Sequence, residues 1–308
     1  MKKFISLAVI ICFLIPVAGF GASDTLTRAL GHITSVQEEN GAWSRLRGEF
    51  PPEAEPTGWA VKVLSMRRGQ GPAVEKGVAF LLKDQKPDGS WNNNTAHTAF
   101  AILALTQAQR GGEAVRKGIA YLRGVQDGQG GFRRIGREGA PLTVYTAVVV
   151  DAFKAAGLAG EDPAVERAVS WLKSCQNGDG GYGMPKGSPS VALGTAWTIR
   201  ALRATGVDVQ APEVRNGVAC LLTMQAPSGG FSMGRGLPED PEITAYAIMG
   251  LKGLPAALDA VARAAAYLGR AQHDDGAFTS AAPIQFNHQP KENTQTTLFV
   301  VWALTEIE

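Results

Sequence analysis

The 308-residue sequence has few cysteines, little net charge and few long apolar runs, and each shortage excludes a class of protein. Three cysteines are too few for a fold built on a disulfide framework. The 30 lysines and arginines are scattered, and 28 acidic residues nearly balance them, unlike the clustered basic face of a nucleic-acid-binding protein. The motifs of nucleophile-elbow hydrolases, phosphate-binding loops and HExxH metalloproteases are absent as well. We therefore expect no nucleic acid among the partners of this protein.

The one long apolar run lies at the N-terminus. Residues 4–17 are almost all apolar, two lysines precede them, and a mostly small-residue segment follows at positions 19–23. This order is typical of a secretory signal peptide, and the run is too short for a membrane span. We predict that residues 1–23 are a signal peptide. The mature chain, residues 24–308, should then be exported to the periplasm or the extracellular space, without a membrane-spanning segment.

A repeated frame organises the rest of the chain. In each repeat a glutamine is followed by a glycine four residues later and by an aromatic residue six residues later. Successive glutamines lie 41 to 50 residues apart, a period typical of two helices with their connections. The six sets are Gln37/Gly41/Trp43, Gln85/Gly89/Trp91, Gln126/Gly130/Phe132, Gln176/Gly180/Tyr182, Gln225/Gly229/Phe231 and Gln272/Gly276/Phe278.

Each repeat predicts one amphipathic helix and one buried helix. The segment before each glutamine, such as residues 164–176, has apolar residues at three- and four-residue steps and charged residues on its other face. The second segment begins near a threonine and is apolar on nearly every side. Six such hairpins predict an all-α fold, an (α/α)6 toroid with the buried helices as the inner of two concentric rings; an open superhelix is the alternative. The six threonines are Thr57, Thr98, Thr146, Thr195, Thr244 and Thr297.

One rim of such a ring is the expected place for a site. The connections from the glutamine to the threonine are long, whereas those to the next amphipathic helix are short. The inner helices also direct their N-termini, with partial positive charge, to the rim of long connections. We expect Tyr145 to line the cavity there. Arg133 and Arg235 lie in the same connections and would bind an anionic ligand, unless they belong to an ordinary solvated rim.

The segment from Lys76 to Trp91 shows the repeated frame in full. Its frame positions are Lys76, Gly77, Phe80, Leu81, Gln85, Gly89 and Trp91. They resemble, almost residue for residue, the QW repeat of the terpenoid cyclases, including the squalene cyclases, and the related repeat of protein prenyltransferase β subunits. The resemblance covers nearly the whole mature chain and implies the toroid fold. It implies less about the reaction, because relatives of this fold have several functions.

A second resemblance concerns the residues just before Thr244. The sequence D-P-E-I-T-A at residues 240–245 resembles the acidic D-x-D-D-T-A motif of class II terpenoid cyclases, whose middle acid protonates an alkene or epoxide. The resemblance implies that Glu242 is the proton donor and Asp240 its partner, with a hydrophobic or isoprenoid-like molecule as ligand. Ile243 stands where the motif has its third acid.

A metal site is a further interpretation of the rim. Prenyltransferase β subunits hold zinc with residues that precede their inner helices, including a histidine in a frame like the A-H-T around His97. The resemblance implies that His97, Glu53 and Glu55 bind zinc or another divalent metal. Two glutamates without a thiolate are a poor set for zinc, so a structural role for His97 is the competing interpretation.

Two functions of different class therefore stay open. One is an enzyme similar to terpenoid cyclases that acts on an isoprenoid or lipid. The other is a non-catalytic module that binds an apolar or anionic ligand, or a protein partner, through the same rim. The incomplete acid motif, and the presence of one toroid where complete cyclases resemble two in series, favour the second.

Two residue pairs are interpreted as structural. Asp151 and Arg200 each stand five residues after a threonine and should form an ion pair inside the wall of inner helices. Cys175 and Cys220, the only cysteines of the mature chain, should be buried and unpaired.

Overall fold

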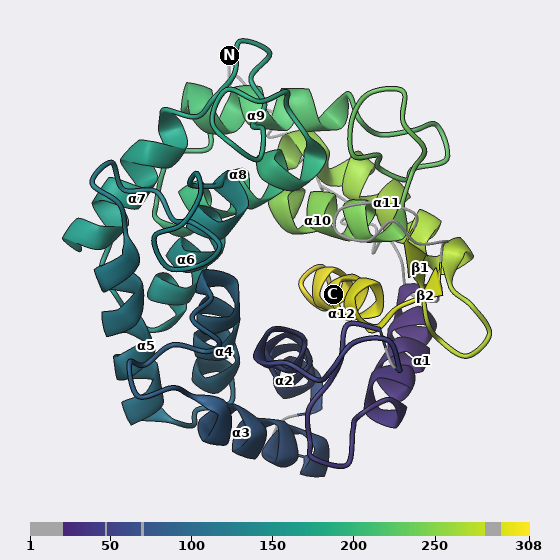
Figure 1. Ribbon diagram of the computed structural model, residues 1–308. Coiled ribbons are helices and arrows are strands. Elements are labelled where there is room, and N and C mark those ends of the chain that lie inside the picture. The colour runs from purple at the N-terminus through teal and green to yellow at the C-terminus, as the bar shows by residue number, and fades with distance from the viewer. Residues whose placement is uncertain (1–20, 47, 69–70, 281–290) are drawn as a thin grey trace, which may run out of the picture.

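A computed structural model describes residues 21–46, 48–68, 71–280 and 291–308 of the chain. Its helices form two concentric rings, as Figure 1 shows, and the predicted toroid is thereby confirmed. The outer helices are α1 (Gly21–Ser35), α3 (Pro72–Asp84), α5 (Gly112–Val125), α7 (Pro163–Lys173), α9 (Pro212–Leu222) and α11 (Leu258–Ala271). The inner helices are α2 (Ala54–Arg68), α4 (Thr95–Gln107), α6 (Thr143–Ala155), α8 (Ala192–Ala204), α10 (Pro241–Leu251) and α12 (Thr294–Thr305). Residues 1–20 of the predicted signal peptide lie outside the described residues.

The two rings differ in burial as their sequences predict. In α7, apolar side chains such as Val165 and Leu172 are buried on one face, while Glu166 and Arg167 on the other face are exposed. In α10 every residue is buried. The remaining regular elements are the short helix η1 (Pro255–Ala257) and a two-stranded antiparallel ribbon of β1 (Thr279–Ser280) and β2 (Lys291–Glu292). Amphipathic helices thus enclose largely buried ones, which place their side chains around the central axis.

The repeated glutamine joins each repeat to the next. In all six repeats its side-chain amide donates one hydrogen bond to the carbonyl of the frame glycine and another to a carbonyl in the first turns of the next outer helix. Gln85, for example, donates to Gly89 and to Ala114. The last joint connects Gln272 to Thr25 at 2.8 Å. The array is therefore a closed ring, and the open superhelix is excluded.

The frame glycine allows the backbone of one repeat to approach the next outer helix closely. Each of the six has a positive φ, between +85° and +101°, a region that favours glycine. A Cβ atom there would meet a backbone carbonyl oxygen of the next outer helix, at 2.2 Å in the case of Gly130 and Arg167. Any other residue would need both a strained backbone and a displaced helix.

The repeated threonine has a role that its position alone does not reveal. In every repeat its hydroxyl accepts a hydrogen bond from the backbone N–H of the frame aromatic residue. Several of these hydroxyls, including that of Thr98, also donate to the carbonyl four residues earlier. The threonine therefore lies within the first turn, and each inner helix begins three residues before it.

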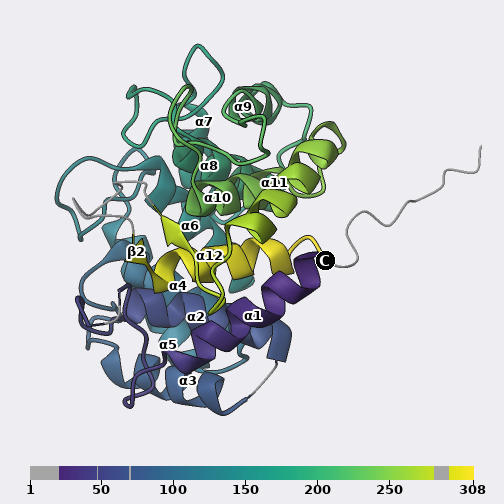
Figure 2. The ribbon, with the colours of Figure 1, turned by 90° about the vertical axis from the view of Figure 1, so that its right-hand side faces the viewer.

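The long connections all lie at one end of the ring, at the left in Figure 2, whereas the C-terminus lies at the other end. The N-termini of the inner helices consequently share the rim of long connections. Cys175 and Cys220 are buried and free, as predicted. Within the described ranges, no helix has the length and apolarity needed to cross a membrane.

Candidate functional site

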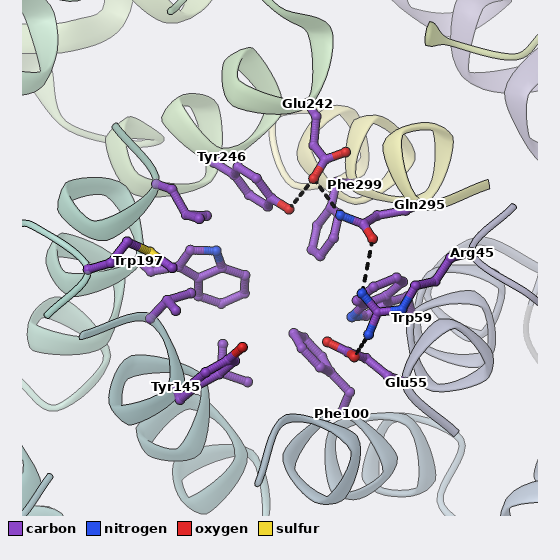
Figure 3. A pocket seen from close by; sticks show the side chains of 14 residues that line it. Arg45, Glu55, Trp59, Phe100, Tyr145, Trp197, Glu242, Tyr246, Gln295 and Phe299 are labelled. Carbon is purple, nitrogen blue, oxygen red and sulfur yellow. Dashed lines mark hydrogen bonds and ion pairs between the residues drawn. The ribbon is translucent and has the colours of Figure 1, made fainter. Parts of the chain in front are cut away.

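A cavity opens in the lumen at the rim of long connections (Figure 3). Its volume is about 60 Å³. Most of its lining comes from two positions of the repeat, two residues before and two residues after the threonine, which are one helical turn apart and face the same way. The first position supplies Glu55, Val144, Leu193, Glu242 and Gln295. The second position supplies Trp59, Phe100, Val148, Trp197, Tyr246 and Phe299.

The side chains at the first position form an upper layer of the lumen, and those at the second position form a second layer below it. The second layer is almost entirely aromatic. The ring centroids of Tyr246 and Phe299 lie 4.7 Å apart, and those of Trp59 and Phe299 lie 4.9 Å apart. Phe100 and Trp197 complete the cluster with edge-on contacts. These rings fill the lumen below the first layer, so the cavity is a shallow cup. Its floor is formed mainly by these aromatic rings, whose faces carry partial negative charge and attract cations.

Glu242 enters this cup from the first turn of α10. It is 4% exposed and points into the cavity in Figure 3. Its Oε1 accepts hydrogen bonds from the Tyr246 hydroxyl at 2.7 Å and from the Gln295 amide at 2.6 Å, and its Oε2 accepts one from the Thr296 hydroxyl at 2.8 Å. Burial raises the pKa of Glu242, and the negative charge of Asp240 adds to the effect, although the three donors oppose it. Glu242 therefore holds its proton more firmly than an exposed glutamate.

The raised pKa of Glu242 predicts a pH dependence of stability. A carboxyl whose pKa is raised on folding contributes most at low pH, and the contribution is lost as pH rises from its ordinary value of 4.5 through the raised value. We expect the free energy of unfolding of the wild type to fall, relative to that of Glu242→Gln, over this window. Denaturant titrations of both proteins between about pH 4 and pH 8 measure the difference. A constant difference across the window would contradict the expectation.

Asp240 holds the start of α10 in place. It is the N-cap residue, and its Oδ1 accepts hydrogen bonds from the backbone N–H groups of Glu242 and Ile243. Its Oδ2 accepts a hydrogen bond from the Ser280 hydroxyl at 2.9 Å. Asp240 does not line the cavity. It acts on Glu242 through position and charge, as a partner rather than as the group that faces the lumen.

The predicted metal residues do converge, but around a different cation. The Arg45 guanidinium donates to Glu55 Oε2 and lies 3.7 Å from Glu53. His97 Nε2 is 3.3 Å from the same oxygen of Glu55. Among the residues that the structure describes, no group of three potential ligand side chains is arranged to hold a metal ion. A guanidinium takes the place of zinc between these carboxylates, so the residues do not fit a metal centre.

This cluster keeps Glu55 charged. Burial by itself would raise the pKa of Glu55, but Arg45 and His97 outweigh it and hold that pKa below its ordinary value. The cup therefore contains two buried glutamates with opposite pKa shifts, raised for Glu242 and lowered for Glu55.

Gln295 connects the two glutamates, and it belongs to none of the motifs in the sequence. Its amide donates to Glu242, and its carbonyl oxygen accepts from Arg45 at 3.4 Å. Arg45 in turn contacts Glu55 and lies over the Trp59 ring. A sequence signal for Gln295 existed, since it stands two residues before its threonine, as do Glu55 and Glu242.

The three predicted ligand-binding residues separate into two groups. Tyr145 lines the cavity, across it from Glu242 in Figure 3. Arg133 lies outside the lumen, where it donates to the Gly139 carbonyl and pairs with Asp127. Arg235 also lies outside and donates to the Thr223 hydroxyl. Neither arginine lines the cup, and both belong to surface grooves between neighbouring rim connections.

A third layer of charged residues lies deeper in the lumen, five residues after the threonines. Arg200 pairs with Asp151, as predicted, and also with Glu306. Lys62 stands over the Trp302 ring, 4.8 Å from its centroid. Burial and the charge of Arg200 lower the pKa of Lys62 to about 8. The end of the lumen opposite the cup therefore contains charged side chains of both signs, most of which form ion pairs.

Comparison with known families gives matches along most of the chain. A family model for the squalene-hopene cyclase C-terminal domain matches residues 8–102 and 95–239, and one for the prenyltransferase α/α toroid domain matches residues 189–305. A squalene–hopene cyclase of Bradyrhizobium diazoefficiens is 28% identical over 162 residues. This match covers 48% of the chain and 18% of that relative, so the chain spans less than a fifth of its length.

Solved structures of the same fold cover nearly the whole chain. A type II terpene cyclase from Scytonema, in complex with geranylgeranyl dihydroxybenzoate as its substrate, has a TM-score of 0.75 and 16% identity over 93% of this chain and 97% of that one. Candida albicans protein geranylgeranyltransferase-I has a TM-score of 0.62 and 14% identity over 82% and 83%. At these identities the likeness shows the fold alone, and it confirms the resemblance read from the repeats.

Proposed function

We propose a function for this chain on the basis of its family: the chain belongs to the squalene-hopene cyclase C-terminal domain family. The proposal is that Glu242 is a carboxylic acid that protonates a terminal alkene of a linear isoprenoid or related lipid. The carbocation that forms is stabilised by the aromatic faces below it. The observation that supports this most directly is a buried carboxyl group of raised pKa that faces an aromatic cup.

The surroundings of Glu242 suit a proton donor. Both hydrogen-bonding directions of Oε1 are taken by Tyr246 and Gln295, so the acidic proton resides on Oε2, beside Thr296. A rotation of the carboxyl group brings this proton to the cavity, and the last torsion of a glutamate is broad enough to allow it. Once the proton has left, the same three groups donate to the carboxylate and stabilise its charge.

The size of the cup limits what enters it. A volume of about 60 Å³ is well below the roughly 300–1,000 Å³ of sites that enclose a drug-sized ligand. We infer that only the reacting end of the chain enters, while the rest lies along the rim connections. The predicted signal peptide supports a site of action outside the cytoplasm. Because isoprenoid diphosphates are mainly cytoplasmic, a neutral isoprenoid lipid is the better substrate.

The proposal is tested by turnover in heavy water. The protein is incubated in D₂O with squalene and with geranylgeranyl dihydroxybenzoate, and the lipids are analysed by mass spectrometry and NMR. We expect a cyclic product that carries one deuterium on carbon, because the proton on Glu242 exchanges with solvent before it is transferred. Recovery of both lipids unchanged and unlabelled would end the catalytic proposal.

A second candidate is a module that binds a lipid without converting it. Two observations favour it: the cup is small, and the buried Ile243 replaces the third acid of the motif that it resembles. Native mass spectrometry of protein isolated from its source distinguishes the two. A retained, linear lipid together with no turnover supports binding alone, and a retained cyclic lipid supports the enzyme.

A further inference from the structure

Glu55 presents one oxygen atom that the surrounding cluster does not use. Arg45 and His97 both contact its Oε2. Its Oε1 has no hydrogen-bonding partner in the described part of the chain, although Glu55 is only 7% exposed. Figure 3 shows this oxygen pointing toward the centre of the cavity. A carboxylate oxygen that faces the cavity, and that no protein group occupies, is available to a ligand there.

The two glutamates stand at the ends of a polar arc in the lumen, which is formed by Glu242, Gln295 and Glu55. Glu242, Gln295 and Glu55 occupy the same repeat position on α10, α12 and α2, which follow each other around the ring. The corresponding residues of the other three inner helices are apolar. A ligand in the cup thus meets Glu242 at one end of the arc, Glu55 at the other, and apolar side chains opposite.

We propose that Glu55 Oε1 is the base that ends the reaction, by taking a proton from the last carbocation; this rests on the proposed function of Glu242. Glu242 gives its proton to one carbon of the alkene, and the π electrons form that C–H bond. Further alkenes attack the cation and form the C–C bonds of the rings. Glu55 then takes a proton from a carbon next to the final cationic centre, and the C–H electrons become a new C=C bond. The net reaction is an isomerisation, without added water.

The two glutamates are reset by exchange with solvent. Glu242 ends the reaction ionised and takes up one proton, whereas Glu55 ends it neutral and releases one. The opposite pKa shifts of the two groups favour both steps, since the fold stabilises the proton on Glu242 and the charge on Glu55. A carboxylate of lowered pKa remains an adequate base here, because a carbocation is far more acidic than a carboxylic acid.

The test compares the products of Glu55→Gln with those of the wild type, with squalene and geranylgeranyl dihydroxybenzoate as probes. Protonation by Glu242 is intact in this variant, so lipid consumption should change by less than about tenfold. Loss of the base should slow alkene formation by about a hundredfold, and water then captures the cation. We expect the ratio of cyclic alkene to cyclic alcohol to fall by about tenfold or more. Glu55→Asp, which keeps the carboxylate, should restore part of the alkene.

Glu53→Gln is the matched control. Glu53 contacts the same two groups, Arg45 and His97, but does not line the cavity, so its loss removes equal charge without removing the base. We expect its product ratio to equal that of the wild type. An unchanged ratio in Glu55→Gln, with consumption intact, would overturn the role of Glu55 and leave that of Glu242 standing. Absence of turnover in the wild type would overturn both.

Discussion

Glu242→Gln is expected to lower the rate of isoprenoid cyclisation by about a hundredfold to ten-thousandfold, the usual contribution of a positioned general acid. An amide has the size of the carboxyl group but no proton acidic enough for an alkene. Its oxygen still accepts from Tyr246 and Gln295, and its nitrogen donates to the Thr296 hydroxyl, so the local structure is retained. The measurement is the initial rate of lipid consumption with squalene or geranylgeranyl dihydroxybenzoate.

Glu239→Gln is the control for this prediction. Glu239 lies three residues earlier and contacts the Ser228 hydroxyl outside the cavity. Its rate should match the wild type within about twofold, because Glu239 does not line the cup in which the alkene is protonated. Thermal unfolding of both variants checks that each is folded. If Glu242→Gln is folded and retains the wild-type rate, then Glu242 is not the acid.

Gly130→Ala is expected to destabilise the fold by about 3–5 kcal/mol, among the larger effects of a single substitution. Its φ of +101° is strained for alanine, and the added Cβ would lie 2.2 Å from the Arg167 carbonyl oxygen. That carbonyl belongs to α7, so the joint between the third and fourth repeats must open to admit the methyl group. Urea unfolding measures the change in free energy.

Gly187→Ala separates the two causes of this effect. Gly187 has a φ of +80°, but a Cβ there meets no atom within 4 Å. Its substitution carries only the backbone strain, about 1–2 kcal/mol. The excess loss in Gly130→Ala then reports the close approach of two backbones. Equal losses in the two variants would show that the joint yields freely and that the frame glycine is required for its conformation alone.

Much of the fold was predictable because its determinants are local and repeated. The spacing of glutamine, glycine and aromatic residue predicted the hairpins, and six copies in register predicted the ring. The function of the threonine was not predictable, because its hydroxyl binds the backbone of an aromatic residue across a connection of variable length. That each inner helix begins near its threonine was predictable, and the structure places the start three residues before it.

The candidate site was predictable only in part. Glu242 and Tyr145 were found from a motif and from their place on the rim. Glu55 was found for a different reason, as a metal ligand, because the sequence does not reveal that Arg45 from the first connection reaches it. Gln295 was missed since it belongs to no motif and acts by joining residues far away in sequence. The shared position two residues before a threonine was the signal that would have connected Glu55, Glu242 and Gln295.

The hydrogen bond from Gln272 to Thr25, which closes the ring, affects how the protein unfolds. A linear stack of repeats frays, since its terminal units have one neighbour and are released by breaking one interface. Here every repeat has two neighbours held by the same kind of joint. Releasing any one of them means opening two joints at once, so partial unfolding is suppressed all around the ring. The polar arc of α10, α12 and α2, which includes the first and last inner helices, is therefore held as firmly as any other part of the wall.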